Sequence, residues 1–169
     1  MTVTFQKGGN YITNMKGALS SSLNYNIQHY TCSKETFEAV CPYADVVLVE
    51  ADGSKGRPLK YPNETEPVIP ENTEEIIVVC GLNAIGQKAK DVCHRLELVK
   101  ECLGIEDDTC ITPAHVQTLV TQGYLNPLKA AYPKAQITLM PRHDGSLYQR
   151  AIASLLQNDQ DVSMLHREW

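Results

Sequence analysis

The stretch "VVLVEADGSKGRPLK", Val46 to Lys60, contains the features that decide both the fold and the candidate site. Four apolar residues run directly into two carboxylates, Glu50 and Asp52. A short continuous apolar run is typical of a parallel strand that is covered on both faces. The glycine-punctuated loop that follows carries three cations, Lys55, Arg57 and Lys60. The stretch therefore predicts a buried strand whose carboxyl end and following loop are charged.

Two further apolar runs, Glu75–Cys80 ("EIIVVC") and Gln136–Met140 ("QITLM"), predict strands of the same kind. Caps and apolar stripes predict helices between and after them. The first expected helix runs from Ser33 to Pro42 and turns Phe37, Val40 and Cys41 inward. The second carries the apolar stripe Val92, Leu96, Val99 and Leu103 and ends at Gly104. Three more are expected: one from Thr112-Pro113 to Gly123, a shorter one that starts at Asn126-Pro127, and one with the stripe Leu147, Ala151 and Leu155. This alternation predicts an α/β fold with a mostly parallel, doubly wound sheet flanked by helices.

Length and composition predict a single α/β domain over residues 1–169. The net charge of -5 argues against a nucleic-acid-binding protein. No apolar run approaches the roughly 20 residues of a membrane span, and the opening "MTVTFQKGGNYITN" lacks the pattern of a secretion signal. We therefore expect a cytoplasmic protein that binds neither nucleic acid nor membrane. Its six cysteines contain no C-x2-C pair and are expected to be free thiols, with a redox or metal role left open for Cys80 and Cys93.

The two carboxylates are expected where ligands of open α/β sheets bind, beyond the carboxyl ends of the strands. Residues two apart share one face of an extended chain, so Glu50 and Asp52 would project together. A magnesium ion or the downstream cations would compensate their charge. The predicted residues for binding a phosphate or carboxylate anion are Gly53, Ser54, Lys55, Gly56, Arg57 and Lys60. The alternative is a polar turn with solvated charges, and spacing alone leaves both interpretations open.

At these residues the sequence resembles the YqeC family, the accessory proteins of selenium-dependent hydroxylases. The resemblance is carried by "VLVEADGSKGRPLK", "EPVIP" at Glu66–Pro70, "IIVVCGLNAIG" at Ile76–Gly86 and "CHRLELV" at Cys93–Val99, and it runs from about Asp45 to about Leu156. It implies a P-loop-NTPase-like fold, ATP or GTP as ligand, and a role in maturing selenium-dependent molybdenum hydroxylases. In that frame "VVLVEADG" resembles a Walker B strand, in which Glu50 and Asp52 orient hydrated magnesium.

The chain departs from this family pattern at its beginning. Family members usually start with a glycine-rich phosphate loop, and this chain has no G-x4-G-K-[ST] segment. The segment most similar to such a loop is "TVTFQKGGNYITNMKG", in which Lys16 is followed by glycine and not by Ser or Thr. The expected fold is therefore P-loop-NTPase-like without the Walker A segment. An N-terminally shortened form and a natural short form that binds something else are both compatible with the sequence.

Two further sites, at Arg95 and Asp144, carry the family pattern more weakly, and Glu66 lies in the "EPVIP" segment. Arg95, at the start of a helical turn in "CHRLE", would reach a ligand anion or remain an ordinary surface arginine. Asp144, in "LMPRHDG", would contact a nucleotide base or cap the following helix. Glu66 would face Lys55 or Lys60, or be solvated. All three are retained as predicted ligand-binding residues.

Two functional hypotheses follow. The first is a nucleotide-dependent, NTPase-like accessory protein for the maturation of selenium-dependent molybdenum hydroxylases, with Glu50 and Asp52 as its catalytic, metal-orienting residues. The second is a non-catalytic module that binds an anionic cofactor or the client hydroxylase through the same loop. Without a phosphate loop, the isolated chain is not expected to hydrolyse nucleotide.

Overall fold

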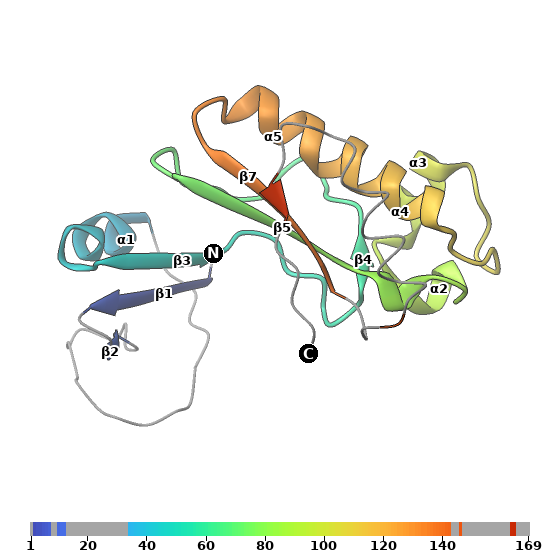
Figure 1. Ribbon diagram of the computed structural model, residues 1–169, viewed down its shortest axis with the longest axis horizontal. Coiled ribbons are helices and arrows are strands. Elements are labelled where there is room, and N and C mark those ends of the chain that lie inside the picture. Colours follow the sequence, from blue (N-terminus) through green and yellow to red (C-terminus); the bar gives the residue numbers. More distant parts are fainter. Residues whose placement is uncertain (1, 8–9, 13–33, 143–145, 147–162, 165–169) are drawn as a thin grey trace. The chain divides into compact units, whose positions relative to one another are not determined.

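The computed structural model describes residues 2–7, 10–12, 34–142, 146 and 163–164 (Figure 1). The chain forms two compact units. Unit 1 consists of Met1–Gly53 and Glu66–Ile69, and unit 2 of Ser54–Thr65 and Pro70–Trp169. The boundary after Gly53 falls inside the stretch that sequence analysis singled out.

Unit 1 contains an antiparallel sheet rather than the expected parallel one. Its strand order is β2-β1-β3, with β1 at Thr2–Lys7, β2 at Asn10–Ile12 and β3 at Val46–Glu50. Strand β3 runs antiparallel to β1, and Glu50 lies opposite Thr2. The prediction of a parallel strand was wrong here because a short apolar run does not encode the direction of its neighbour.

Burial in unit 1 also differs from the expectation. Val46 and Leu48 of β3 are exposed, so the strand is not covered on both faces.

The predicted first helix is present as α1, Lys34–Val40, and is followed by the 3-10 turn η1, Cys41–Tyr43. Phe37 is buried as expected, whereas the predicted cap at Ser33 lies outside the described residues.

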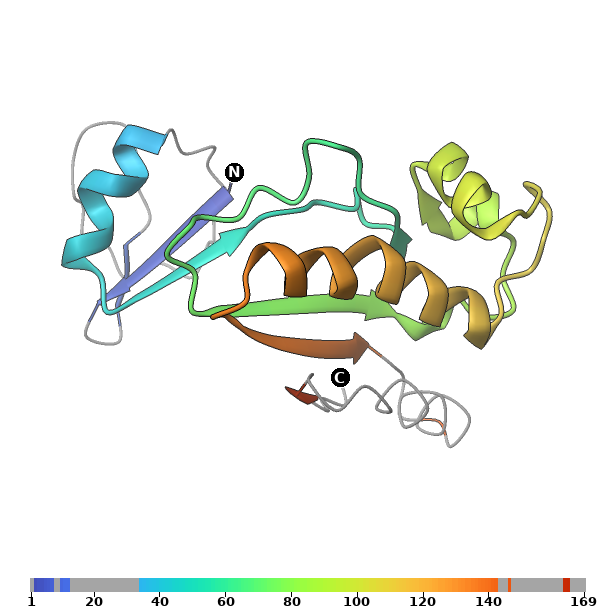
Figure 2. The ribbon, with the colours of Figure 1, turned by 90° about the horizontal axis from the view of Figure 1, so that it is seen from above.

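Unit 2 is built on a parallel sheet. Strands β5 (Glu75–Gly81), β7 (Gln136–Arg142) and β8 (Ser163–Met164) lie in the order β5-β7-β8, and both pairings are parallel. The two predicted strands are thus confirmed as a parallel pair. A long helical segment lies across one face of β5 and β7 in both ribbon views (Figures 1 and 2). On β5 the even-numbered side chains from Ile76 to Cys80 are buried, but Ile77 and Val79 on the other face are exposed.

The long helical segment is continuous where sequence analysis expected a break. It consists of α4 (Pro113–Val120), a π-helical turn η3 (Thr121–Leu125) and α5 (Asn126–Ala131). Its start was predicted correctly, since the Thr112 side chain accepts a hydrogen bond from the His115 N–H at 3.2 Å. Gly123 does not end the helix. It lies in the π turn, where a Cβ atom would come within 3.2 Å of the Tyr61 ring, so the glycine allows a close contact instead of a helix stop.

A second helical region was predicted as one stripe and is interrupted. Helix α2 (Ala89–Val92) is followed by strand β6 (Cys93–His94) and helix α3 (Leu96–Leu103). The interruption occurs at Arg95, which has a φ of 57° in the left-handed region. Gly104 ends α3 in the left-handed conformation, as expected. Strand β6 pairs in parallel with β4 (Leu59–Lys60), which lies in the stretch that was expected to be a loop after the acidic strand.

The chain is therefore an α/β protein, but the described strands form three small sheets rather than one doubly wound sheet. The short 3-10 turn η2, Leu82–Ala84, follows β5. The expected helix with Leu147, Ala151 and Leu155 lies outside the described residues. Among the described helices, none has the length and apolar character needed to cross a membrane.

Candidate anion-binding site

The two predicted carboxylates lie in unit 1. Glu50 is the exposed last residue of β3, and Asp52 is half-buried two residues later. Between them, the carbonyl oxygen of Ala51 accepts a hydrogen bond from the Val68 N–H at 3.0 Å. A Cβ atom on Gly53 would lie 3.6 Å from Glu50 Oε1, an ordinary contact distance. Because β3 is antiparallel to β1, these carboxylates are not at the carboxyl edge of a parallel sheet within their unit.

The loop cations belong to unit 2 and begin with a tight turn. The Arg57 N–H donates to the Ser54 carbonyl oxygen at 3.1 Å, and both central residues have positive φ, 52° for Lys55 and 76° for Gly56. Positive φ at both positions is the property of type I′ turns, which favour glycine. A Cβ atom on Gly56 would meet no other atom within 4 Å. This glycine is therefore needed for the positive φ of the turn and not for close contact with another segment. The Lys55 side chain is exposed.

Arg57 has an intramolecular role that sequence analysis did not anticipate. Its Nη1 donates to the carbonyl oxygen of Lys90 at 2.6 Å and to that of Cys93 at 3.3 Å. These oxygens lie at the end of α2 and the start of β6, where helix carbonyls lack partners within the helix. Arg57 therefore attaches the loop to α2 and holds β6 beside β4.

Helix α2 is also attached to the loop that contains Asp107 and Asp108. The Lys90 N–H donates to the Asp107 carbonyl oxygen at 3.1 Å, and Lys90 Nζ lies 2.7 Å from Asp108 Oδ1. Lys88 Nζ lies 2.9 Å from the same Asp108 oxygen. Hydrogen bonds and attraction from these two ammonium groups lower the pKa of Asp108 from 3.8 to about 2. Lys90 thus links the Asp107–Asp108 loop to the Arg57 side chain.

Backbone packing fixes the position of β4. The Gly81 N–H at the end of β5 donates to the Pro58 carbonyl oxygen at 2.9 Å. A Cβ atom on Gly81 would lie only 2.5 Å from Pro58 Cβ and 2.7 Å from Asn83 Oδ1, so only glycine fits without a shift. The loop cations are therefore placed at the carboxyl end of β5, the end where parallel sheets bind ligands.

Lys60, His94 and Arg95 gather where β4 and β6 end. Lys60 is opposite His94 in the parallel register, and its side chain is only 6% exposed. Lysine is rarely buried to this extent without a charged or polar environment. Arg95 follows directly and precedes the first residue of α3, so its guanidinium is attached where the helix dipole is positive. Sequence analysis proposed Lys60 and Arg95 but missed His94, whose pairing with Lys60 depends on a two-residue strand that the sequence does not signal.

Two thiols near this region are poorly suited to redox or metal chemistry. Burial raises the pKa of Cys80 to about 12. Burial also raises the pKa of Cys93 to about 11, although the nearby Arg57 guanidinium opposes the shift. Both thiols are therefore protonated at neutral pH, and the thiolate is the reactive and metal-binding form.

The residues of the predicted site are divided between the two units. Unit 2 contains Lys60, Arg95 and the turn from Ser54 to Arg57. Unit 1 contains Glu50, Asp52, Gly53 and the half-buried Glu66. Asp144 lies outside the described residues. Within the described ranges, no cluster of three or more His, Cys, Asp or Glu side chains is arranged to hold a metal ion.

Comparison with known proteins places the chain in a family. A family model described as YqeC protein matches residues 6–97, which is more than half of the 169 residues. A protein from Escherichia coli (strain K12), named "Uncharacterized protein YqeC", is 38% identical over 80 residues. These residues make up 47% of this chain and 31% of the relative, so the match spans about a third of the relative's length. No solved structure matches the chain. The chain belongs to the YqeC family.

Proposed function

We propose that this chain is an accessory protein in the maturation of selenium-dependent molybdenum hydroxylases. In this proposal it binds a phosphate-bearing ligand at the carboxyl ends of β4 and β6, without hydrolysing it. The observation that carries the binding proposal is the nearly complete burial of Lys60 opposite His94, directly before Arg95. The maturation role rests on what the resemblance of the "VLVEADGSKGRPLK" and "EPVIP" segments to the YqeC family implies.

The chemistry of these residues favours an anion. An ammonium group buried in a medium of low dielectric attracts a phosphate oxygen more strongly than a solvated one does. Arg95 adds a guanidinium with several donors, and the start of α3 adds the positive end of a helix dipole. Arg57 acts as a positioning residue, because its hydrogen bonds to Lys90 and Cys93 hold β6 in place.

The carboxylates in unit 1 fit a hydrated magnesium ion only in part. Magnesium in proteins commonly uses one or two carboxylates and keeps several waters or ligand phosphates. Glu50 and Asp52 supply that number, and the described residues add no third carboxylate, His or Cys to form a cluster. A magnesium ion held by these two carboxylates would supply positive charge and ordered water beside them. We therefore propose Glu50 and Asp52 as magnesium-orienting residues.

Calorimetric titration of the full chain with ATP, GTP and pyrophosphate tests the binding site. We expect at least one of these to bind, and Lys60→Met to weaken it about tenfold or more, a loss of about 1.4 kcal/mol. Arg95→Gly should weaken it similarly, because glycine keeps the positive φ while the guanidinium is removed. The matched control is Lys134→Met, an exposed lysine in the same unit. Equal affinities for all four proteins would refute the site.

The maturation role needs a test in cells. In a host with a selenium-dependent molybdenum hydroxylase, removal of this protein should abolish hydroxylase activity while the hydroxylase polypeptide still accumulates. Wild type and Lys134→Met should restore the activity, and Lys60→Met should not. Full activity in the deleted strain would rule out the role, whatever the titrations show.

A further inference from the structure

We propose that the outer edge of β5 binds an extended segment of a partner protein as an added strand, and that this segment combines apolar residues with a basic residue. The site is separate from the β4–β6 site. It is formed by the backbone of Glu75, Ile77 and Val79, by the exposed side chains of the last two, and by acidic residues where β5 begins.

The hydrogen-bond pattern shows which backbone groups face outward. In the parallel pairing with β7, the Glu74 carbonyl oxygen accepts from the Gln136 N–H at 2.8 Å. Even-numbered residues of β5 therefore point their backbone groups toward β7, and odd-numbered residues point theirs to the other side. The Gly81 N–H, which donates to Pro58, confirms this alternation. Within the described sheet β5 is a terminal strand, so Glu75, Ile77 and Val79 present donors and acceptors at an edge.

The side chains at this edge are apolar and exposed. Ile77 is 46% exposed and Val79 is 50% exposed, and both lie on the sheet face opposite to the buried Ile76 and Val78. Natural sheets usually protect such edges with lysines, prolines, bulges or covering segments, because an open edge is a template for another strand. Glu75 is the one charged residue that β5 contains. A partner strand would satisfy the backbone groups and cover Ile77 and Val79 at the same time.

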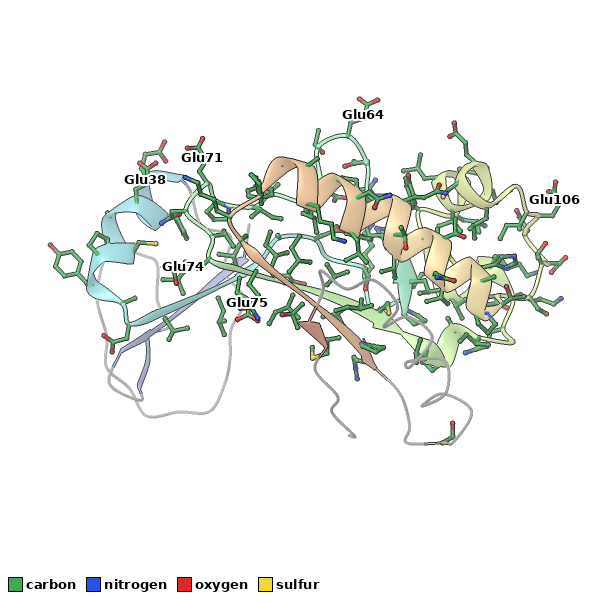
Figure 3. All side chains as sticks on the ribbon, turned by 45° about the horizontal axis from the view of Figure 1, so that its top comes forward. Glu38, Glu64, Glu71, Glu74, Glu75 and Glu106 are labelled. Carbon is green, nitrogen blue, oxygen red and sulfur yellow. The ribbon has the colours of Figure 1, made fainter. Side chains whose placement is uncertain are left out.

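Charge and length define the chemistry of the partner. Glu74 and Glu75 are exposed and lie where β5 begins (Figure 3). A lysine or arginine at the matching end of the partner segment would complement them. At the other end Pro58 occupies the edge beside Gly81, so the added strand spans Glu75 to Val79. The same acidic end disfavours a nucleic-acid partner.

The probes are fluorescently labelled seven-residue peptides in which valine alternates with threonine. One peptide ends in a lysine, a second ends in a glutamate, and a third has neither. Anisotropy titration of the full chain should show the lysine peptide binding about tenfold more tightly than the glutamate peptide. Hydrogen exchange read residue by residue should slow at the amides of Ile77 and Val79. It should stay unchanged at Ile76 and Val78, whose amides already face β7.

Variants separate this site from other exposed apolar positions. Ile77→Lys and Val79→Lys should abolish binding, whereas Val68→Lys, at a valine that is also 50% exposed, should not. The double variant Glu74→Gln/Glu75→Gln should equalise the lysine and glutamate peptides. Lys60→Met should leave peptide binding intact, so failure here is distinguishable from failure of the anion site. Circular dichroism melts confirm that each variant is folded.

Two outcomes would overturn the proposal. One is peptide binding to wild type that is no tighter than binding to Ile77→Lys. The other is a wild-type dimer, seen by light scattering, that Ile77→Lys dissociates. That result would assign the edge to a second copy of the chain instead of a partner segment.

Discussion

Arg57 donates to the carbonyl oxygen of Lys90 at 2.6 Å, across 33 positions of sequence. This bond joins the loop that follows the predicted acidic strand to the end of α2. We expect Arg57→Ala to lower the free energy of unfolding by about 1.5–3 kcal/mol, the range for hydrogen bonds to charged groups. Urea denaturation measures the change, and Lys55→Ala, at an exposed neighbour, should stay within about 0.5 kcal/mol of wild type. Wild-type stability combined with lost anion binding would make Arg57 a ligand residue instead.

Gly81→Ala should also destabilise the protein, because the added methyl group would overlap Pro58 and Asn83. Such overpacking typically costs about 1–3 kcal/mol. Gly53→Ala is the matched control, since its nearest contact would be an ordinary 3.6 Å, and it should change stability by less than about 0.5 kcal/mol. Similar urea midpoints for the two variants would show that the Pro58 segment shifts freely.

Acid stability should depend on Asp108. Its folded-state pKa of about 2 lies below the ordinary 3.8, because Lys90 and Lys88 favour the carboxylate. The stabilisation is therefore present above about pH 4 and is lost as the pH falls from about 4 through 2. Asp108→Asn should show a smaller loss of urea midpoint across this range than wild type. Glu106→Gln, at an exposed acidic residue of the same loop, should keep the wild-type pH dependence.

Cys80 and Cys93 should react slowly with a disulfide reagent at pH 8. With pKa values of about 12 and 11 they are almost entirely protonated there, so labelling should be at least about a hundredfold slower than at the exposed Cys110. Peptide mapping by mass spectrometry distinguishes the sites. Labelling in denaturant, where burial is removed, should be fast at all three. Fast native labelling of Cys93 would indicate local opening of the β4–β6 pair.

The purified 169-residue chain should hydrolyse neither ATP nor GTP above background. Phosphoryl transfer depends on positioning and charge stabilisation, and a phosphate loop supplies the amides, lysine and hydroxyl group that do this. Each charge-assisted contact of this kind contributes about 1.5–3 kcal/mol. A chain that lacks several of them should hold a nucleotide in the phosphate-loop arrangement several orders of magnitude more weakly. Phosphate release measured with magnesium present checks this. Turnover that Lys60→Met abolishes would show that the anion site is catalytic.

Strand positions followed from the sequence, but strand direction and coverage did not. The apolar runs at Val46–Glu50 and Glu75–Gly81 both form strands, yet one is antiparallel to β1 and the other parallel to β7. Direction depends on which distant segment provides the neighbour, and an apolar run contains no such information. Exposure of Leu48 and Ile77 has the same origin, because an apolar side chain does not specify what covers it.

Local chemistry predicted helix ends only where no tertiary contact intervened. Thr112 caps α4 and Gly104 ends α3, since these depend on nearby backbone groups. Gly123 was misassigned because its role is to admit the Tyr61 ring, which comes from elsewhere in the chain. In the candidate site, too, only the features that depend on neighbouring residues could be predicted from the sequence. The charged loop was identified, but Arg57 is engaged by the Lys90 carbonyl through a contact that no sequence pattern encodes.

The division of the chain into two units also affects how this gene can change. The polypeptide passes from unit 1 to unit 2 after Gly53, returns at Glu66 and leaves again after Ile69. The returning strip supplies the Val68 N–H that bonds to Ala51. One break in the gene therefore cannot separate the two units, because either product would carry a remnant of the other. Recombination that exchanges or discards unit 1 intact would need three breaks, one after Gly53, one after Thr65 and one after Ile69.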